Sequence, residues 1–243
     1  MIRPDDGEAL LLGMDPQIEP VKVQSITGYL PGEMQFFDNL TGERQLRLFH
    51  DMRNQRADWD YVHQLAERFD LNLKTQIKNL SKGNKQKIGV IQAFMHRPEL
   101  LILDEPTSGL DPLMQHEVLS LIHEANAAGA TIFFSSHIMS EVESVAARVA
   151  IIRAGEIVEV AETENLTRRT LNRLTVRFKQ PVNASEFNTL PEVEILSQPD
   201  PLKVTLQVTG DMQSLIQVLS RMPVLDLETE RLSLEEVFMT YYK

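Results

Sequence analysis

The chain has 243 residues, 42% apolar and 24% charged, which is the balance of an ordinary soluble globular protein. Its formal net charge of −11 argues against a broad nucleic-acid-binding surface, because such a surface needs clustered lysine and arginine. The absence of cysteine excludes disulfides and thiolate metal sites. The length is sufficient for one large domain with a small appendage.

The apolar runs of the sequence are only a few residues long, far below the roughly 20 residues that span a bilayer. The first residues, 1–6 (MIRPDD), also lack the apolar core of a signal peptide. We therefore expect a cytoplasmic chain whose contact with a membrane comes through a partner.

The first third of the chain is predicted to contain loops followed by helices. A turn at residues 4–7 (PDDG) favours loops and short strands up to about residue 30. Apolar residues at helical spacing predict surface helices over residues 42–53 and 58–69. A further helix is expected over residues 84–95, with the Ser81 hydroxyl as its N-cap.

Two short apolar runs, residues 100–103 (LLIL) and 131–134 (TIFF), lie between turn signals. This pattern is typical of parallel strands that are buried on both faces. Between the runs, Asp111 and the proline after it predict the start of a helix, and Gly129 predicts its end. The stretch is therefore expected to form one βαβ unit.

The last part of the chain differs in its pattern. A short helix over residues 140–147 and a hairpin over residues 148–160, turning at Ala154 and Gly155, are expected first. After about residue 165, two alternating strands and an amphipathic helix are predicted, over residues 173–178, 203–208 and 212–222. We expect a first domain over residues 1–165 and a small α+β domain over residues 166–243.

Candidate catalytic side chains follow the two apolar runs. Asp104 and Glu105 come after the first run, and His137 follows the second. Ligands of open α/β sheets bind where parallel strands end, so these side chains are expected to lie close together. One carboxylate could hold a magnesium phosphate while the other orients a water molecule. The simpler alternative is that the acids only cap a helix or form a turn.

Residues 80–86 (LSKGNKQ) form a candidate anion site ahead of the first strand. Ser81, Gly83 and the free N–H groups at a helix start can bind an anion, and the helix dipole assists them. The alternative is that Ser81 only caps the helix and Gly83 only eases a turn.

Four segments in this order resemble ABC transporter ATP-binding subunits. Residues 80–86 resemble the signature motif, and residues 100–106 (LLILDEP) resemble the Walker B strand with its catalytic glutamate. Residues 108–111 (SGLD) resemble the D-loop, and His137 resembles the switch histidine. The resemblance covers residues 1–165 and implies an α/β fold, namely a P-loop NTPase-like ABC ATPase domain with a helical subdomain.

The resemblance also implies roles, with ATP and Mg²⁺ as cofactors. Asp104 would support Mg²⁺, Glu105 would polarise the hydrolytic water, and His137 would contact the γ-phosphate. These are the roles of the nucleotide site within one subunit.

Further residues would serve a second ATP-binding subunit, identical or different, in a head-to-tail dimer. Ser81 and Gly83 would contact the γ-phosphate held by that subunit. Gln86 is carried over as a nucleotide-binding residue in the same motif. Asp111 would lie at the dimer interface, and it also suits a helix cap.

Two features depart from the family pattern. No phosphate loop, G-x-x-x-x-G-K-[ST], occurs upstream of residue 80, so the chain as given would not hold ATP alone. We expect that at least about 25 residues, comprising a strand, this loop and its helix, are missing before Met1. In residues 29–33 (YLPGE), Gly32 occupies the place of the usual magnesium-binding glutamine, and the role does not transfer to Gln35.

The favoured hypothesis is an ATPase subunit that powers efflux through a separate transmembrane permease, on the inner face of the cell membrane. Residues 232–242 resemble the tail of prokaryotic exporter-type subunits, although an ordinary apolar helix face explains them equally. One alternative is a degenerate subunit that only supplies its signature motif to a partner's ATP. Another is a soluble ABC protein acting on ribosomes or DNA, which would usually carry two ATPase units or long coiled coils.

Overall fold

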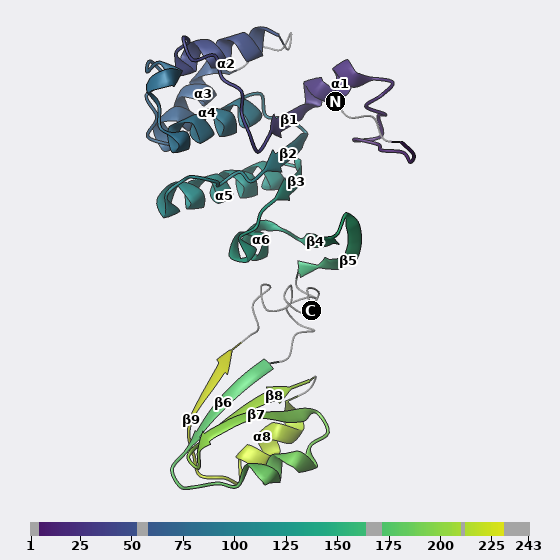
Figure 1. The fold of residues 1–243 in the computed structure, drawn as a ribbon, viewed down its shortest axis with the longest axis vertical. Coiled ribbons are helices and arrows are strands. Elements are labelled where there is room, and N and C mark those ends of the chain that lie inside the picture. Colours follow the sequence, from purple (N-terminus) through teal and green to yellow (C-terminus); the bar gives the residue numbers. More distant parts are fainter. Residues whose placement is uncertain (1–4, 53–57, 164–171, 210–211, 231–243) are drawn as a thin grey trace. The chain divides into compact units, whose positions relative to one another are not determined.

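A computed structural model describes residues 5–52, 58–163, 172–209 and 212–230 (Figure 1). Its contacts divide the chain into two compact units, Met1–His137 and Ile138–Lys243. The domain boundary expected between residues 165 and 166 lies outside the described residues and stays a prediction.

The N-terminal unit contains a parallel sheet in the order β1-β2-β3 (Figure 1). Its strands are β1 (Thr27–Leu30), β2 (Leu100–Asp104) and β3 (Thr131–Ser135). Helix α5 (Pro112–Ala127) connects β2 to β3, which pair in parallel with Asp104 opposite Ser135. The predicted βαβ unit is thereby confirmed.

Four helical segments lie between β1 and β2: α2 (Gly42–Asp51), α3 (Trp59–Arg68), η1 (Ile77–Asn79) and α4 (Lys82–Phe94). Side chains of Thr41, Asp58 and Ser81 accept hydrogen bonds from the free N–H groups at the starts of α2, α3 and α4. The three helices predicted from the apolar spacing are confirmed to within two residues at each end.

Helix α4 is the central helix of the unit, because it packs against α2, α3 and β1. All of residues 87–94 are buried. Two glycines allow α4 to approach β1 closely. A Cβ atom on Gly28 would lie 2.2 Å from the carbonyl oxygen of Ala93, and one on Gly89 would lie 2.8 Å from Leu30 Cδ1. The helix therefore lies nearly backbone to backbone on the strand.

The prediction of only loops and short strands up to residue 30 was wrong in one respect. Residues Pro20–Ile26 form helix α1. Pro20 occupies one of its first positions, where the missing N–H has no cost, and Val23 on its inner side is buried. A helix of seven residues presents too few turns for its apolar spacing to be recognised in the sequence.

The prediction that residues 131–134 are buried on both faces was also wrong. Strand β3 pairs only with β2 among the described residues, so it is an outer strand of its sheet. One of its faces is covered, whereas the side chain of Phe133 on the other face is 68% exposed. An apolar run alone did not distinguish a central strand from an outer one.

Arg68 connects helices α3 and α5. Its guanidinium donates to Glu117 at 2.6 Å and to Glu124 at 2.8 Å. The hydrogen bond from Arg68 lowers the pKa of Glu124, and the two carboxylates raise the pKa of Arg68. These two ion pairs hold α3 against α5.

The C-terminal unit begins with helix α6 (Met139–Val145) and the hairpin of β4 (Arg148–Arg153) and β5 (Glu156–Glu162). Ala154 and Gly155 form the turn with φ values of 51° and 84°. Two successive positive φ values are typical of a type I′ turn, which suits the twist of a hairpin. The predicted hairpin and its turn are confirmed.

The same unit contains an antiparallel sheet in the order β7-β8-β6-β9. One face of this sheet forms a core with η2 and α8, in which Leu174, Phe187 and Leu206 are fully buried. The elements are β6 (Asn172–Phe178), η2 (Ala184–Thr189), β7 (Val193–Asp200), β8 (Lys203–Val208), α8 (Gln213–Leu219) and β9 (Val224–Glu230). Strands β6 and β8 and helix α8 were predicted, but the outer strands β7 and β9 were not.

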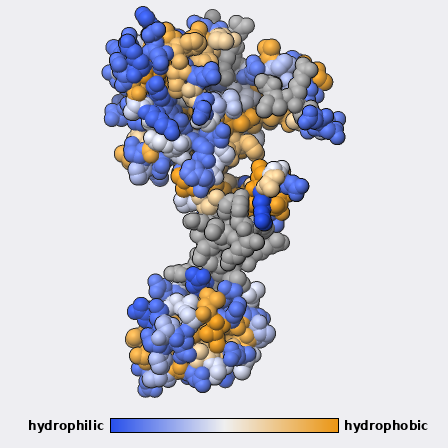
Figure 2. Space-filling view, in the orientation of Figure 1, coloured by the Kyte–Doolittle hydropathy of each residue, from blue (hydrophilic) through white to orange (hydrophobic). Residues whose placement is uncertain are grey.

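Hydrophobic side chains remain on the surface of each unit, mixed with hydrophilic ones (Figure 2). Phe37, Leu113 and Phe133 are examples in the N-terminal unit, and Ile216 and Leu225 in the C-terminal unit. No helix among the described ranges combines the length and apolar character needed to cross a bilayer.

Candidate functional site

The ends of β2 and β3 bring polar side chains together, as the sequence predicts. The parallel register sets Asp104 opposite Ser135. The Ser135 hydroxyl donates to Asp104 Oδ1 at 2.5 Å, and the Glu105 N–H lies 3.2 Å from both the carbonyl and the hydroxyl oxygen of Ser135. Strand β3 thus orients the first carboxylate through Ser135, a residue to which the sequence analysis gave no role.

Glu105 and His137 form the second part of the site. Oε2 of Glu105 lies 2.7 Å from Nδ1 of His137. The side chain of His137 is 73% exposed and that of Glu105 is 29% exposed, so the pair can be reached from solvent. Two of the predicted catalytic residues are therefore in direct contact, beside the carboxylate of Asp104.

The backbone of Glu105 has φ of 50°, in the left-handed region that non-glycine residues rarely adopt. This conformation turns the chain sharply as it leaves β2. The turn is closed by a hydrogen bond from the Ser108 N–H to the Glu105 carbonyl oxygen at 3.1 Å.

The segment of residues 80–86 lies against this turn. The Ser81 hydroxyl caps α4 by accepting from the Asn84 N–H at 3.2 Å, which confirms the predicted cap. A Cβ atom on Gly83 would lie 2.8 Å from the Gly109 carbonyl oxygen, so the two loops are in close contact. The Gln86 Nε2 atom donates to the carbonyl oxygens of Glu105 and Pro106, each at 3.1 Å.

Asp111 caps helix α5, as predicted. Its Oδ1 atom accepts from the N–H groups of Leu113 and Met114, both at 3.1 Å. Its expected place at a dimer interface stays a prediction, as do the expected nucleotide contacts of Ser81, Gly83 and Gln86.

Gly32 lies next to the carboxylate of Asp104. A Cβ atom on Gly32 would be 2.8 Å from Asp104 Oδ2. This residue stands where the family pattern has glutamine, and a side chain here would require the Asp104 carboxylate to move. The sequence showed the departure but not the contact, because residues 32 and 104 are brought together only by the pairing of β1 with β2.

Asp104 fits the requirements of a magnesium phosphate. Its residue is exposed, and Oδ2 accepts no hydrogen bond from the described part of the chain, while Oδ1 is held by Ser135. Mg²⁺ is typically bound by one or two carboxylates together with water and phosphate oxygens. The arrangement is thus suited to hold a metal-bound phosphate at Asp104 and a water molecule at Glu105.

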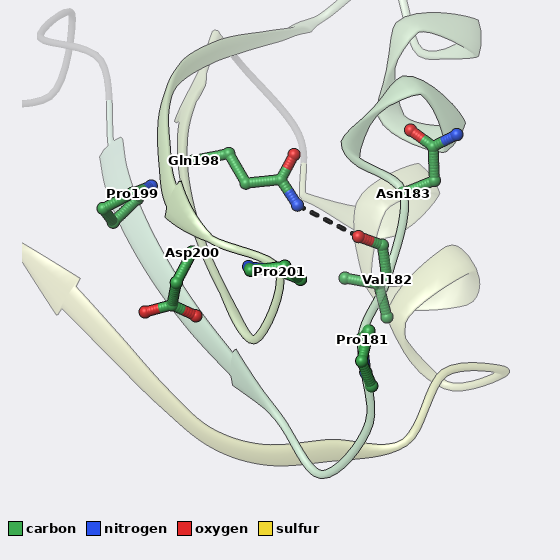
Figure 3. A pocket seen from close by; sticks show the side chains of 7 residues that line it. All are labelled: Pro181, Val182, Asn183, Gln198, Pro199, Asp200 and Pro201. Carbon is green, nitrogen blue, oxygen red and sulfur yellow. Dashed lines mark hydrogen bonds between the residues drawn. The ribbon is translucent and has the colours of Figure 1, made fainter.

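A pocket of about 580 Å³ occurs in the C-terminal unit (Figure 3). It is lined by Pro181, Val182, Asn183, Gln198, Pro199, Asp200 and Pro201, and Gln198 Nε2 donates to the Val182 carbonyl oxygen at 3.0 Å across it. Asp200 is the single ionisable residue of this lining, so the pocket lacks the paired acid and base of the β2–β3 site. We therefore place the candidate site at the strand ends.

Comparison with known proteins agrees with this geometry. Residues 1–108 match the family model described as ABC transporter. The N-terminal part of the chain is thus similar to the ABC transporter family, and it is called the ABC domain below. The matched range includes the signature-like segment and the Asp104–Glu105 pair of this ABC domain.

Curated relatives of the ABC domain include an uncharacterized ABC transporter ATP-binding protein of Nostoc sp., 38% identical over 164 residues. They also include the linearmycin resistance ATP-binding protein LnrL of Bacillus subtilis, 34% identical over 185 residues. These alignments cover 65% and 71% of this chain, and 48% and 58% of the relatives. The chain thus spans about half the length of the curated relatives that it matches.

A solved structure described as the ATP-binding subunit of an ABC transporter is similar to the chain, with a TM-score of 0.64 and 29% identity. The similarity covers 69% of this chain and 71% of that one. The α/β ABC ATPase fold predicted from the sequence is thereby confirmed at the level of the fold family.

Proposed function

We propose that the protein is an ATP-hydrolysing subunit of an ABC transporter, which drives efflux through a separate permease. The observation that carries the proposal is the contact of Glu105 with His137 beside Asp104, at the strand ends of an ABC domain. A chain that only binds a partner has no chemical need for an acid and a base in contact next to a second acid.

Each residue of the site has a role in this proposal. Asp104 would hold Mg²⁺, which would supply positive charge against the phosphate groups. Glu105 accepts a hydrogen bond from the attacking water and orients it. His137 donates toward the γ-phosphate from its exposed side while Nδ1 contacts Glu105.

The partners follow from the same proposal. A second ATP-binding subunit would place its nucleotide against Ser81 and Gly83, which lie at the start of α4. A transmembrane permease would hold the pair at the inner face of the cell membrane. Efflux is favoured because the name of one relative, the linearmycin resistance protein, describes resistance to an antibiotic.

The test is the substitution Glu105→Gln in the full-length protein assembled with its permease. We expect ATP to bind as before, while hydrolysis slows at least about 100-fold, or about 2.7 kcal/mol of activation free energy. The matched control is Glu99→Gln, an exposed position just before β2, at the opposite end of the strand from Glu105.

ATP binding is measured by equilibrium titration and hydrolysis by phosphate release. Turnover near that of the unmodified protein in Glu105→Gln would remove this residue from the mechanism. An unmodified protein that neither binds nor hydrolyses ATP would favour the degenerate subunit instead.

A further inference from the structure

We propose that Gln86 is a positioning residue that fixes the backbone of Glu105 and so connects helix α4 to the candidate catalytic carboxylate. Its side-chain amide donates from Nε2 to the carbonyl oxygens of Glu105 and Pro106, both at 3.1 Å. The contact joins residues that are 19 and 20 positions apart in the sequence.

Glu105 needs such support because its backbone has φ of 50°. An L-residue adopts this region at a steric cost, so contacts that hold the turn stabilise it. The N–H of Glu105 is held by Ser135 on β3, and its carbonyl oxygen is held by Ser108 and by Gln86. Gln86 therefore supplies the support that comes from α4.

The chemistry of a primary amide suits this place. Nε2 carries two hydrogens, and each can be donated to one of two successive carbonyl groups. A glutamate of the same size has no donor when ionised, and it would set a charged oxygen against both carbonyl oxygens. A methionine of similar length has no donor and no charge, so it removes the two bonds without repulsion.

Because Gln86 lies on α4, its contact with Glu105 connects the start of this helix to the candidate site. Ser81 and Gly83 begin the same helix, and Gly83 also contacts the Gly109 carbonyl. A displacement of the helix start therefore moves the backbone of Glu105, and with it the carboxylate that contacts His137. This step rests on the proposed function. A movement at a partner's nucleotide would displace the start of α4 and, through Gln86, the carboxylate of Glu105.

The first test is amide hydrogen exchange of the chain with Gln86→Glu, compared with Gln64→Glu on the exposed side of α3. The amides of Glu105, Thr107 and Ser108 are expected to exchange about tenfold faster in Gln86→Glu, because the two hydrogen bonds that hold the carbonyl groups of the turn are lost. Exchange in Gln64→Glu should match the unmodified chain. Unchanged exchange at residues 105–108 in Gln86→Glu would overturn the proposal.

A second variant, Gln86→Met, separates local loosening from repulsion or misfolding. Fluorescence of Trp59 confirms that each variant is folded. The same faster exchange of residues 105–108 in Gln86→Met supports the proposal, and normal exchange there overturns it.

A kinetic test uses the full-length protein with its permease. For a positioning residue, Gln86→Met should lower kcat about tenfold and leave KM for ATP within about twofold. A raised KM with unchanged kcat would show a direct nucleotide contact and overturn the proposal. Faster exchange in a protein whose unmodified form lacks ATPase activity would support the role of Gln86 while contradicting the proposed function.

Discussion

Replacement of Gly28 by alanine tests the close packing of helix α4 on strand β1. The added Cβ atom would lie 2.2 Å from the Ala93 carbonyl oxygen, 2.7 Å from Leu101 Cδ2 and 2.8 Å from Pro98 Cγ. Side chains can move aside by rotation, but the carbonyl belongs to the backbone of a buried helix. Helix and strand must therefore separate by several tenths of an ångström or more.

The expected loss is about 3 kcal/mol in the free energy of unfolding, the upper part of the usual range for overpacked cores. Urea unfolding of the N-terminal unit can be followed through Trp59, the single tryptophan of the chain. The Arg47 guanidinium carbon lies 4.0 Å from its ring centroid, so the fluorescence should change when α2 and α3 separate. The control is Val21→Ala, a side chain that is 78% exposed and whose loss should change stability by less than about 0.5 kcal/mol.

A loss below about 1 kcal/mol in Gly28→Ala would refute the inferred backbone contact. Such a result would mean that α4 does not lie against β1 as described.

Substitutions at three further positions test other contacts. Arg68→Ala should lower the free energy of unfolding by about 1 kcal/mol at pH 7. The value is small because solvent screens the two partly exposed ion pairs. Arg68 lowers the pKa of Glu124 below its ordinary 4.5, so this contribution is present above pH 4.5 and declines as the pH falls below it. Urea unfolding of both proteins at pH 7 and pH 4 measures the effect. A difference in unfolding free energy that grew on acidification would contradict this prediction. Asp111→Ala should lower the stability measured by thermal unfolding by about 1 kcal/mol, because two cap hydrogen bonds are lost. Asp111→Asn should retain most of that stability, and equal effects of the two substitutions would argue against the cap. Phe187→Ala should lower stability by about 3–5 kcal/mol, because the side chain of Phe187 is fully buried. Limited proteolysis should therefore cleave the C-terminal unit faster than in the unmodified chain, and an unchanged rate would contradict this.

The sequence predicted the helices best where a cap and an apolar face agree. Ser81 and Asp111 marked two helix starts, and both side chains cap as expected. Helix α1 and the outer strands β7 and β9 escaped prediction because they are short or largely exposed. Many of their side chains face solvent, where packing does not require an apolar residue, so their apolar periodicity is weak.

The candidate site could be predicted in its residue types but not in its connections. Asp104, Glu105 and His137 follow strands in the sequence, and parallel pairing brings strand ends together. The link from Gln86 to Glu105 depends on the positive φ of Glu105, which no sequence pattern signals. The role of Ser135 likewise depends on the register of β3 against β2.

The division of the chain after His137 bears on how the protein is made. Every hydrogen bond that builds the candidate site joins residues of the unit Met1–His137. Chains emerge from the ribosome from the N-terminus, and domains generally fold as units during synthesis. The acid–histidine arrangement can therefore form on the ribosome while the antiparallel sheet of the C-terminal unit is still being translated.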